Sequence, residues 1–156
     1  MTWETVKLGD IGKISTGNTP SKKETGYYAG GNIAFIKPNN FDKNIISDLS
    51  VSDEYLTKTG SAKSRTVPKD TTLVTCIGTI GNVGITSKQL CFNQQINAIE
   101  PHPDKCISRF LAYSIIYMRK KLQAMANAPV VPIINKNRFS SAIPGYGLKP
   151  HGPGCF

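Results

Sequence analysis

The pattern of apolar and polar residues predicts short strands joined by turns over the first two thirds of the chain. Each apolar run is rich in Val, Ile, Thr or Phe and is bounded by Gly, Pro, Asn or Ser, which is typical of strands. The predicted strands lie within residues 6–17, 32–38, 71–78, 82–87 and 91–101. Residues 18–31 are polar, rich in Gly and interrupted by Pro20, so we expect a long loop there.

The spacing of apolar residues becomes helical in the last third of the chain. Apolar side chains at positions 107, 110, 111, 115, 118, 122 and 125 fall on one helical face and predict one main helix over about residues 104–127. Asp104 is a candidate N-cap, and Pro129 prevents the helix from continuing. The cations of Arg119, Lys120 and Lys121 lie in its later half, where they complement the helix dipole and meet solvent.

Two shorter helices are also predicted, and the end of the chain fits neither element. One helix begins at Ser52 or Asp53 and ends near Gly60, and the other covers residues 136–142 behind Asn135 as its cap. The last 13 residues, PGYGLKPHGPGCF, include four glycines and three prolines, so no periodic element is expected there.

Composition places the chain among globular proteins of one domain. A length of 156 residues suits one core, and no run approaches the roughly 20 apolar residues that cross a bilayer. The first residues, MTWETVKLGD, lack the basic and apolar regions of a signal peptide, so we expect a cytoplasmic protein with no membrane partner. The four cysteines and two histidines lack the close pairs of a zinc site, so we expect no metal and no cofactor.

Charge is distributed unevenly along the chain. The formal net charge is +9, and residues 105–156 carry eight basic side chains and no acidic ones. A basic segment indicates a polyanionic partner. The other interpretation is that acidic sequence which normally follows residue 156 is missing.

The glycines in GTIGNVG, residues 78–84, raise the question of a phosphate-binding loop. A Walker loop needs Gly-Lys-Ser/Thr at its end, and a Rossmann loop needs a helix after its glycines, whereas β-branched residues follow here. We therefore predict a tight turn between strands with positive φ at its glycines. Since no nucleophile, acid–base pair or adenine-methyltransferase motif is found either, the sequence favours binding over catalysis.

Five segments in order resemble the target recognition domain of the DNA-specificity subunits of type I restriction-modification enzymes. They are WETVKLGDIGKISTGNTPS, GNIAFIKPNNF, TTLVTCIGTIGNVGIT, CFNQQINAI and PIINKNRFSSAIP, which together span roughly residues 3–144. The resemblance implies a single globular α+β domain around a curved, mostly antiparallel β-sheet. It also implies a non-catalytic DNA-binding module that reads one half of a bipartite site. The implied partners are double-stranded DNA, adenine-methyltransferase subunits and, indirectly, the restriction subunit.

The resemblance also assigns roles to residues. Gly78, Gly81, Asn93, Gln94 and Gln95 look like framework, with the amides fastening loops by satisfying backbone groups. The rival interpretation is that an Asn or Gln of this group reads adenine directly through two hydrogen bonds.

Three polar loops are the candidates for DNA contact, because recognition needs donors and acceptors at base edges and cations at phosphates. For each residue, a solvated surface position is the competing interpretation. The candidates are Thr19, Ser21, Lys22 and Lys23 in the first loop, Lys37, Asn39 and Asn40 in the second, and Lys63, Ser64 and Arg65 in the third.

The sequence departs from the family pattern after residue 144. The family continues with a spacer helix and a second recognition domain, so we interpret residues 1–144 as the recognition domain and residues 145–156 as an irregular, non-native tail. One alternative is a truncated interaction protein that binds the methyltransferase subunit and modulates or blocks the full specificity subunit. Another is a domain detached from a fused restriction and methylation polypeptide.

Overall fold

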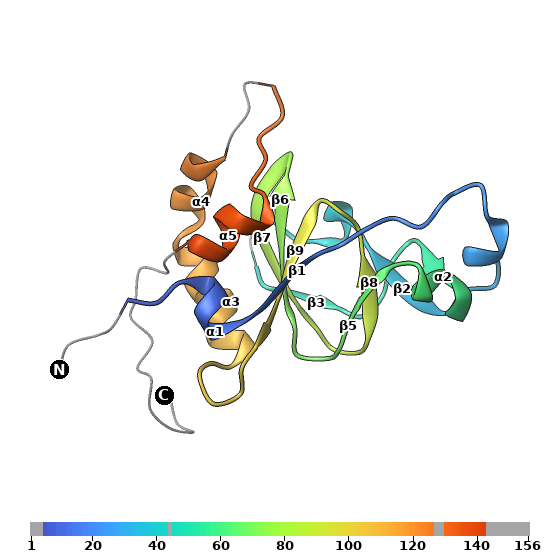
Figure 1. Cartoon of the computed structure of the whole chain (residues 1–156), viewed down its shortest axis with the longest axis horizontal. Coiled ribbons are helices and arrows are strands. Elements are labelled where there is room, and N and C mark those ends of the chain that lie inside the picture. Colours follow the sequence, from blue (N-terminus) through green and yellow to red (C-terminus); the bar gives the residue numbers. More distant parts are fainter. Residues whose placement is uncertain (1–4, 44, 127–129, 143–156) are drawn as a thin grey trace.

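The structure is a computed structural model that describes residues 5–43, 45–126 and 130–142. These residues form an α+β fold with two β-sheets and a group of helices at one side (Figure 1). The predicted fold class is confirmed, and the strand pairs are mostly antiparallel. The pairs β3–β7 and β2–β8 are parallel.

The larger sheet has the strand order β1-β9-β6-β7-β3. These strands are β1 (Gly12–Thr16), β9 (Ile96–Pro101), β6 (Thr72–Ile77), β7 (Thr79–Thr86) and β3 (Ser47–Leu49). β6 and β7 form the hairpin that the glycine pattern predicts, with φ of 76° at Gly78 and 89° at Gly81. Left-handed backbone of this kind favours glycine, so the loop builds a turn rather than a phosphate cradle.

The smaller sheet has the order β4-β2-β8-β5. Its strands are β4 (Tyr55–Leu56), β2 (Ile33–Ile36), β8 (Leu90–Phe92) and β5 (Arg65–Val67). Three short helical turns accompany it: η1 (Thr25–Tyr27), η2 (Pro38–Asn40) and α2 (Lys58–Ala62). In Figure 1, η1 and α2 lie at the end of the molecule remote from the main helices.

One predicted strand is divided between the two sheets. Residues 91–101 do not form a single strand, because the chain turns at 93–95 and passes from β8 in the smaller sheet to β9 in the larger one. The turn is stabilised by Asn93, whose Oδ1 accepts from Gln95 N at 3.1 Å and whose carbonyl oxygen accepts from Ile96 N at 3.2 Å. An Asn side chain stabilises turns in this way by bonding the backbone two residues on.

Two other boundaries differ from the prediction. The strand predicted within residues 6–17 is preceded by one helical turn, α1 (Leu8–Ile11). The helix predicted from Ser52 or Asp53 begins instead at Lys58, because residues 55–56 pair with β2. Thr57 provides the cap, since its Oγ1 accepts from Gly60 N at 3.0 Å.

The predicted main helix over 104–127 consists of two helices, α3 (Ser108–Tyr117) and α4 (Arg119–Met125). Asp104 is not its cap, because residues 102–106 form a turn in which the backbone N–H groups of Lys105 and Cys106 donate to His102 O at 2.9 and 3.1 Å. The break falls at the buried Met118. The short helix α5 (Lys136–Ser141) is confirmed, with Asn135 Oδ1 accepting from Arg138 N at 2.9 Å.

The larger sheet is buried on both faces by two hydrophobic cores, which explains why its strands are continuous apolar runs in the sequence. One core packs α1, α3 and α5 against the larger sheet and includes Val74 and Ile99, and the other lies between the sheets and includes Leu73 and Ala98. Neighbouring residues of β6 and β9 thus face opposite cores, as the two-residue period of a strand requires. In the described part of the chain, no helix has both the length and the apolar character needed to cross a membrane.

Candidate nucleic-acid interface

The loop after β1 is fixed by its backbone to both sheets, to the start of β9 and to the end of β8. Gly17 N donates to Ile96 O at 3.2 Å and Asn18 N donates to Phe92 O at 3.1 Å. A Cβ atom at Gly17 would clash with the carbonyl oxygens of Phe92 and Asn93, so only glycine permits this close approach. We call residues 16–19 the anchored loop.

The anchored loop brings the first and third candidate loops together. Asn18 Nδ2 donates to Lys63 O at 2.8 Å, and Ser64 Oγ donates back to Asn18 O at 3.0 Å. Arg65 Nε donates to Thr16 O at 3.3 Å. The side chains of Lys63 and Arg65 are exposed. The hydrogen bonds to the anchored loop hold the segment that carries them in place.

The end of the anchored loop also contacts the turn between the sheets. Thr19 Oγ1 donates to Gln94 Oε1 at 2.6 Å, and both side chains are exposed. Asn93 differs from Gln94, because its side chain is buried and both ends of its amide bond within the turn, with Nδ2 donating to Gln95 Oε1 at 3.1 Å. The three consecutive amides thus have different surroundings, and Gln94 is the one that faces solvent.

The second candidate loop is tied to an acidic pair. Lys37 Nζ lies 3.1 Å from Asp53 Oδ2 and 2.9 Å from Glu54 Oε2. Lys22, from the first loop, also pairs with Glu54 and lies over the ring of Tyr28, 4.2 Å from its centroid. Partial burial, and then the nearby charge of Lys37, lower the pKa of Lys22 from its usual value. Two of the predicted DNA-binding lysines therefore have their charge countered within the protein.

Asp53 also orders the amides of the second loop. Its Oδ1 accepts from Asn40 Nδ2 at 3.2 Å and from Asn39 Nδ2 at 3.5 Å, while Asn40 Oδ1 accepts from Lys37 N at 2.8 Å. The hydrogen bond from Lys37, and then that from Asn40, hold the pKa of the Asp53 carboxyl well below its usual range. We call Lys22, Lys37, Asp53 and Glu54 the charge network.

The acidic half of the charge network was missed at the level of sequence. Asp53 and Glu54 stand next to each other in a polar turn, but nothing local indicates that they meet lysines 16 to 32 positions away. The remaining candidates, Ser21, Lys23 and Asn39, are exposed, and so is Lys58 of α2, which the sequence reading did not select.

The helical end of the molecule shows a different use of a basic residue. Arg119 was expected to serve the helix dipole and solvent, but its Nε donates to Gly81 O at 2.8 Å and its Nη1 to Lys43 O at 3.1 Å. Arg119 therefore fastens α4 to β7, while Lys120 stays exposed.

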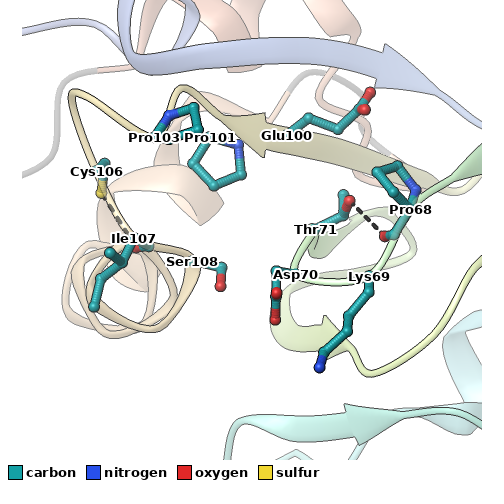
Figure 2. Close-up of a pocket in the computed structure, with 10 residues that line it drawn as sticks. All are labelled: Pro68, Lys69, Asp70, Thr71, Glu100, Pro101, Pro103, Cys106, Ile107 and Ser108. Carbon is teal, nitrogen blue, oxygen red and sulfur yellow. Dashed lines mark hydrogen bonds between the residues drawn. The ribbon is translucent and has the colours of Figure 1, made fainter.

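A cavity of about 540 Å³ lies apart from the three loops, between the turn at 68–71 and the segment 100–108. Figure 2 shows Lys69 and Asp70 on one side of the opening and Ile107 and Ser108 on the other. Its mixed prolines, single cation and scattered carboxylates form no nucleophile–base pair. Among residues 5–43, 45–126 and 130–142, no group of three or more His, Cys, Asp or Glu side chains could hold a metal ion.

Comparison with known proteins gives a consistent result. Residues 1–143 match the type I restriction modification DNA specificity domain family. The type I restriction enzyme HindI specificity subunit of Haemophilus influenzae is 30% identical over 140 residues, which cover 88% of this chain and 30% of that protein. The chain therefore spans about a third of the length of such relatives.

Two solved structures share the fold. The HsdS subunit from Thermoanaerobacter tengcongensis matches with a TM-score of 0.71 and 18% identity, over 95% of this chain and 33% of that one. A structure that describes complex assembly and conformational transition of the type I R-M system matches with a TM-score of 0.71 and 17% identity, over 90% of this chain and 33% of that one. At these identities the likeness concerns the fold.

Proposed function

The chain belongs to the family of type I restriction modification DNA specificity domains, and from this premise we propose that it reads one half of a bipartite duplex DNA site. In such a system the chain corresponds to the specificity component, which is not the catalytic component. The proposal also places the chain in the cytoplasm, together with cellular DNA.

The observation that carries the proposal is that the anchored loop holds in place the segment that bears the exposed cations of Lys63 and Arg65. Specific binding requires cations and donors that reach phosphates and base edges from a scaffold that does not move. Lys63 and Arg65 meet this requirement, because the backbone around them is bonded to the anchored loop. Lys23 and Ser21 of the first loop are exposed as well.

The charge network supports a division of work among the ten candidate residues. Lys22, Lys37 and Asn40 hold the loops in position, since their polar groups bond to Asp53 and Glu54. Ser21, Lys23, Lys63 and Arg65 are left to contact DNA, together with Asn39, whose bond to Asp53 Oδ1 is long at 3.5 Å. Thr19 and Ser64 bond within the protein and act by positioning their neighbours.

Binding selection on random duplexes, followed by titration at several salt concentrations, tests the proposal. A module that neutralises about four phosphates should show a log–log salt slope of about −3.6. Lys63→Ala should weaken binding to all sequences alike. Lys120→Ala should leave binding unchanged, because Lys120 is an exposed residue of α4, and α4 belongs to the helical side of the molecule (Figure 1). The proposal would be refuted if the chain did not bind duplex DNA at low salt, or if Lys63→Ala and Lys120→Ala had equal effects on binding.

The partners in the complex are part of the same proposal. We propose that the helical side of the domain contacts a methyltransferase subunit. The restriction subunit would then be reached indirectly, through the methyltransferase subunit. In support, α3 exposes Tyr113 and Tyr117, at 60% and 65%, one helical turn apart. Residues 105–142 carry seven basic and no acidic side chains, so an acidic protein surface suits this side.

The exposed Tyr113 and Tyr117 also support a second candidate function. In this alternative, the chain binds a methyltransferase subunit and modulates or blocks the full specificity subunit. Co-purification with a methyltransferase subunit, lost in Tyr113→Ser and kept in Lys63→Ala, would support this contact. Inhibition of methylation by added chain would then favour the blocking role over the reading role.

A further inference from the structure

We infer that the surface around Arg65 and Gln94 reads guanine in duplex DNA, an inference that rests on the proposed function. Both side chains lie beside the anchored loop, and the polar groups that they direct to a ligand are hydrogen-bond donors. In the major groove, guanine presents two acceptors, N7 and O6, whereas adenine presents an acceptor and a donor.

Arg65 has its guanidinium oriented by its strand and by one hydrogen bond. It is the first residue of β5 and pairs with Phe92 of β8. Its Nε donates to Thr16 O at 3.3 Å, so the contact to the protein uses the inner nitrogen. The two terminal nitrogens remain as a parallel pair of donors, which is the arrangement that bonds guanine O6 and N7 together.

Gln94 has one end of its amide occupied. Thr19 Oγ1 donates to Gln94 Oε1 at 2.6 Å, so the end left for a ligand is the Nε2 group, a donor. A Gln that reads adenine in bidentate fashion must use its oxygen to accept from N6 and its nitrogen to donate to N7. The contact with Thr19 takes one of the two acceptor positions of Oε1, whereas Nε2 keeps both of its donors, so Gln94 favours an acceptor such as guanine O6 or thymine O4 over adenine.

The anchored loop joins the two side chains into one unit. Its first residue, Thr16, accepts from Arg65, and its last residue, Thr19, donates to Gln94. The carbonyl oxygens of Asn18 and Lys63 each accept a hydrogen bond within the protein, and that of Thr16 accepts from Arg65 itself. The surface is consequently rich in donors, and it should meet guanine at Arg65 and an acceptor base beside it at Gln94.

Two variants of the full 156-residue chain test this inference. The preferred duplex is first found by selection, and affinity is then measured for duplexes with each base pair substituted at each position. Arg65→Ala should abolish discrimination at one guanine, a loss of about 5- to 150-fold in the affinity ratio. Thr19→Val keeps the side-chain shape but frees Gln94 Oε1, so the preference at the neighbouring position should shift toward adenine.

The outcomes separate this inference from the proposed function. Thermal unfolding of both variants checks that they fold, which we expect because both side chains are exposed. A wild-type consensus without guanine, or an Arg65→Ala variant that weakens every sequence alike, would overturn the inference while DNA binding itself stands. Failure of the wild-type chain to bind any duplex at low salt would overturn the proposed function and this inference together.

Discussion

Removal of the Glu54 charge should strengthen non-specific DNA binding and weaken the fold slightly. Glu54 pairs with Lys22 and lies 2.9 Å from Lys37, while its side chain is 20% exposed. In Glu54→Gln, Lys37 keeps Asp53 as a partner at 3.1 Å, but Lys22 loses its carboxylate. The charge of Lys22, whose side chain is 58% exposed, then becomes available to a phosphate.

The size of the effect follows from counterion release. One additional phosphate contact steepens the log–log salt slope by about 0.9, so a slope of about −3.6 should become about −4.5. Between 50 and 200 mM salt, the affinity of the variant should thus fall about 3.5-fold further than that of the wild type. Loss of a partly exposed ion pair costs about 1 kcal/mol at most, so the melting temperature of a domain of this size should fall by no more than about 2–4 °C.

Fluorescence anisotropy with a labelled duplex of random sequence, at four or more salt concentrations, measures the slope. Glu24→Gln is the matched control. Glu24 is an exposed acid in the long loop that also carries Lys22, and its replacement changes the net charge by the same amount. If Glu54→Gln gives the same slope as the wild type, or the same change as Glu24→Gln, then Lys22 does not face DNA and the charge network has no part in binding.

Three further predictions concern the scaffold. Asn135→Ala removes the cap of α5 and should cost about 1 kcal/mol, seen as a melting temperature lower by about 2–4 °C in calorimetry. Gly81→Ala should destabilise more than Gly78→Ala in urea unfolding, because both have positive φ but only at Gly81 would the new Cβ lie 2.7 Å from Arg119 Cγ; equal losses would contradict this. Burial raises the pKa of the Cys76 thiol to about 12, so iodoacetamide at pH 8 should modify Cys76 only after unfolding. The same shift means that stability is lost as the pH rises above about 9, where the unfolded thiol ionises and the folded one does not.

The strands that could be predicted from sequence are those whose local pattern reflects one environment. Residues 32–38 and 71–78 contain β2 and β6, because apolar β-rich runs bounded by Pro or Gly have few other uses. Residues 91–101 misled the same reasoning, since β8 and β9 are both buried and therefore apolar although they belong to different sheets. The local sequence pattern indicates that a strand is buried, but it does not indicate to which sheet the strand belongs.

The main helix shows a second limit. Its apolar face is confirmed at Leu111, Ile115, Met118 and Leu122, which are buried, but not at Ile107, which is exposed. The break at Met118 could not be seen, because the apolar spacing continues across it. The break coincides with the hydrogen bonds from Arg119 to Gly81 O and Lys43 O, and these depend on tertiary contacts with segments 38 and 76 residues earlier.

The candidate site combines residues that sequence could select with pairings that it could not. Polar, basic loops are recognisable by composition, so the sequence alone identifies Lys63 and Arg65 as candidates. The distinction between Lys22, held by Glu54, and Lys23, left exposed, depends on a partner 32 positions away. Gln94 was assigned to the framework for the same reason, because its exposure follows from a turn that the sequence did not reveal.

The arrangement of hydrogen bonds explains how a rigid scaffold can carry variable reading residues. The anchored loop is fixed mainly through the backbone atoms of Gly17 and Asn18, so its position does not depend on the exposed side chains proposed to contact DNA. If Arg65 and Gln94 read bases as inferred above, their replacement should change which base is favoured without removing those backbone bonds. The same logic does not extend to Gly17, where any side chain would clash with the backbone of Phe92 and Asn93 and displace the loop. Specificity in this fold should therefore vary at exposed side chains, while the glycine that permits the close approach limits where the loop can lie.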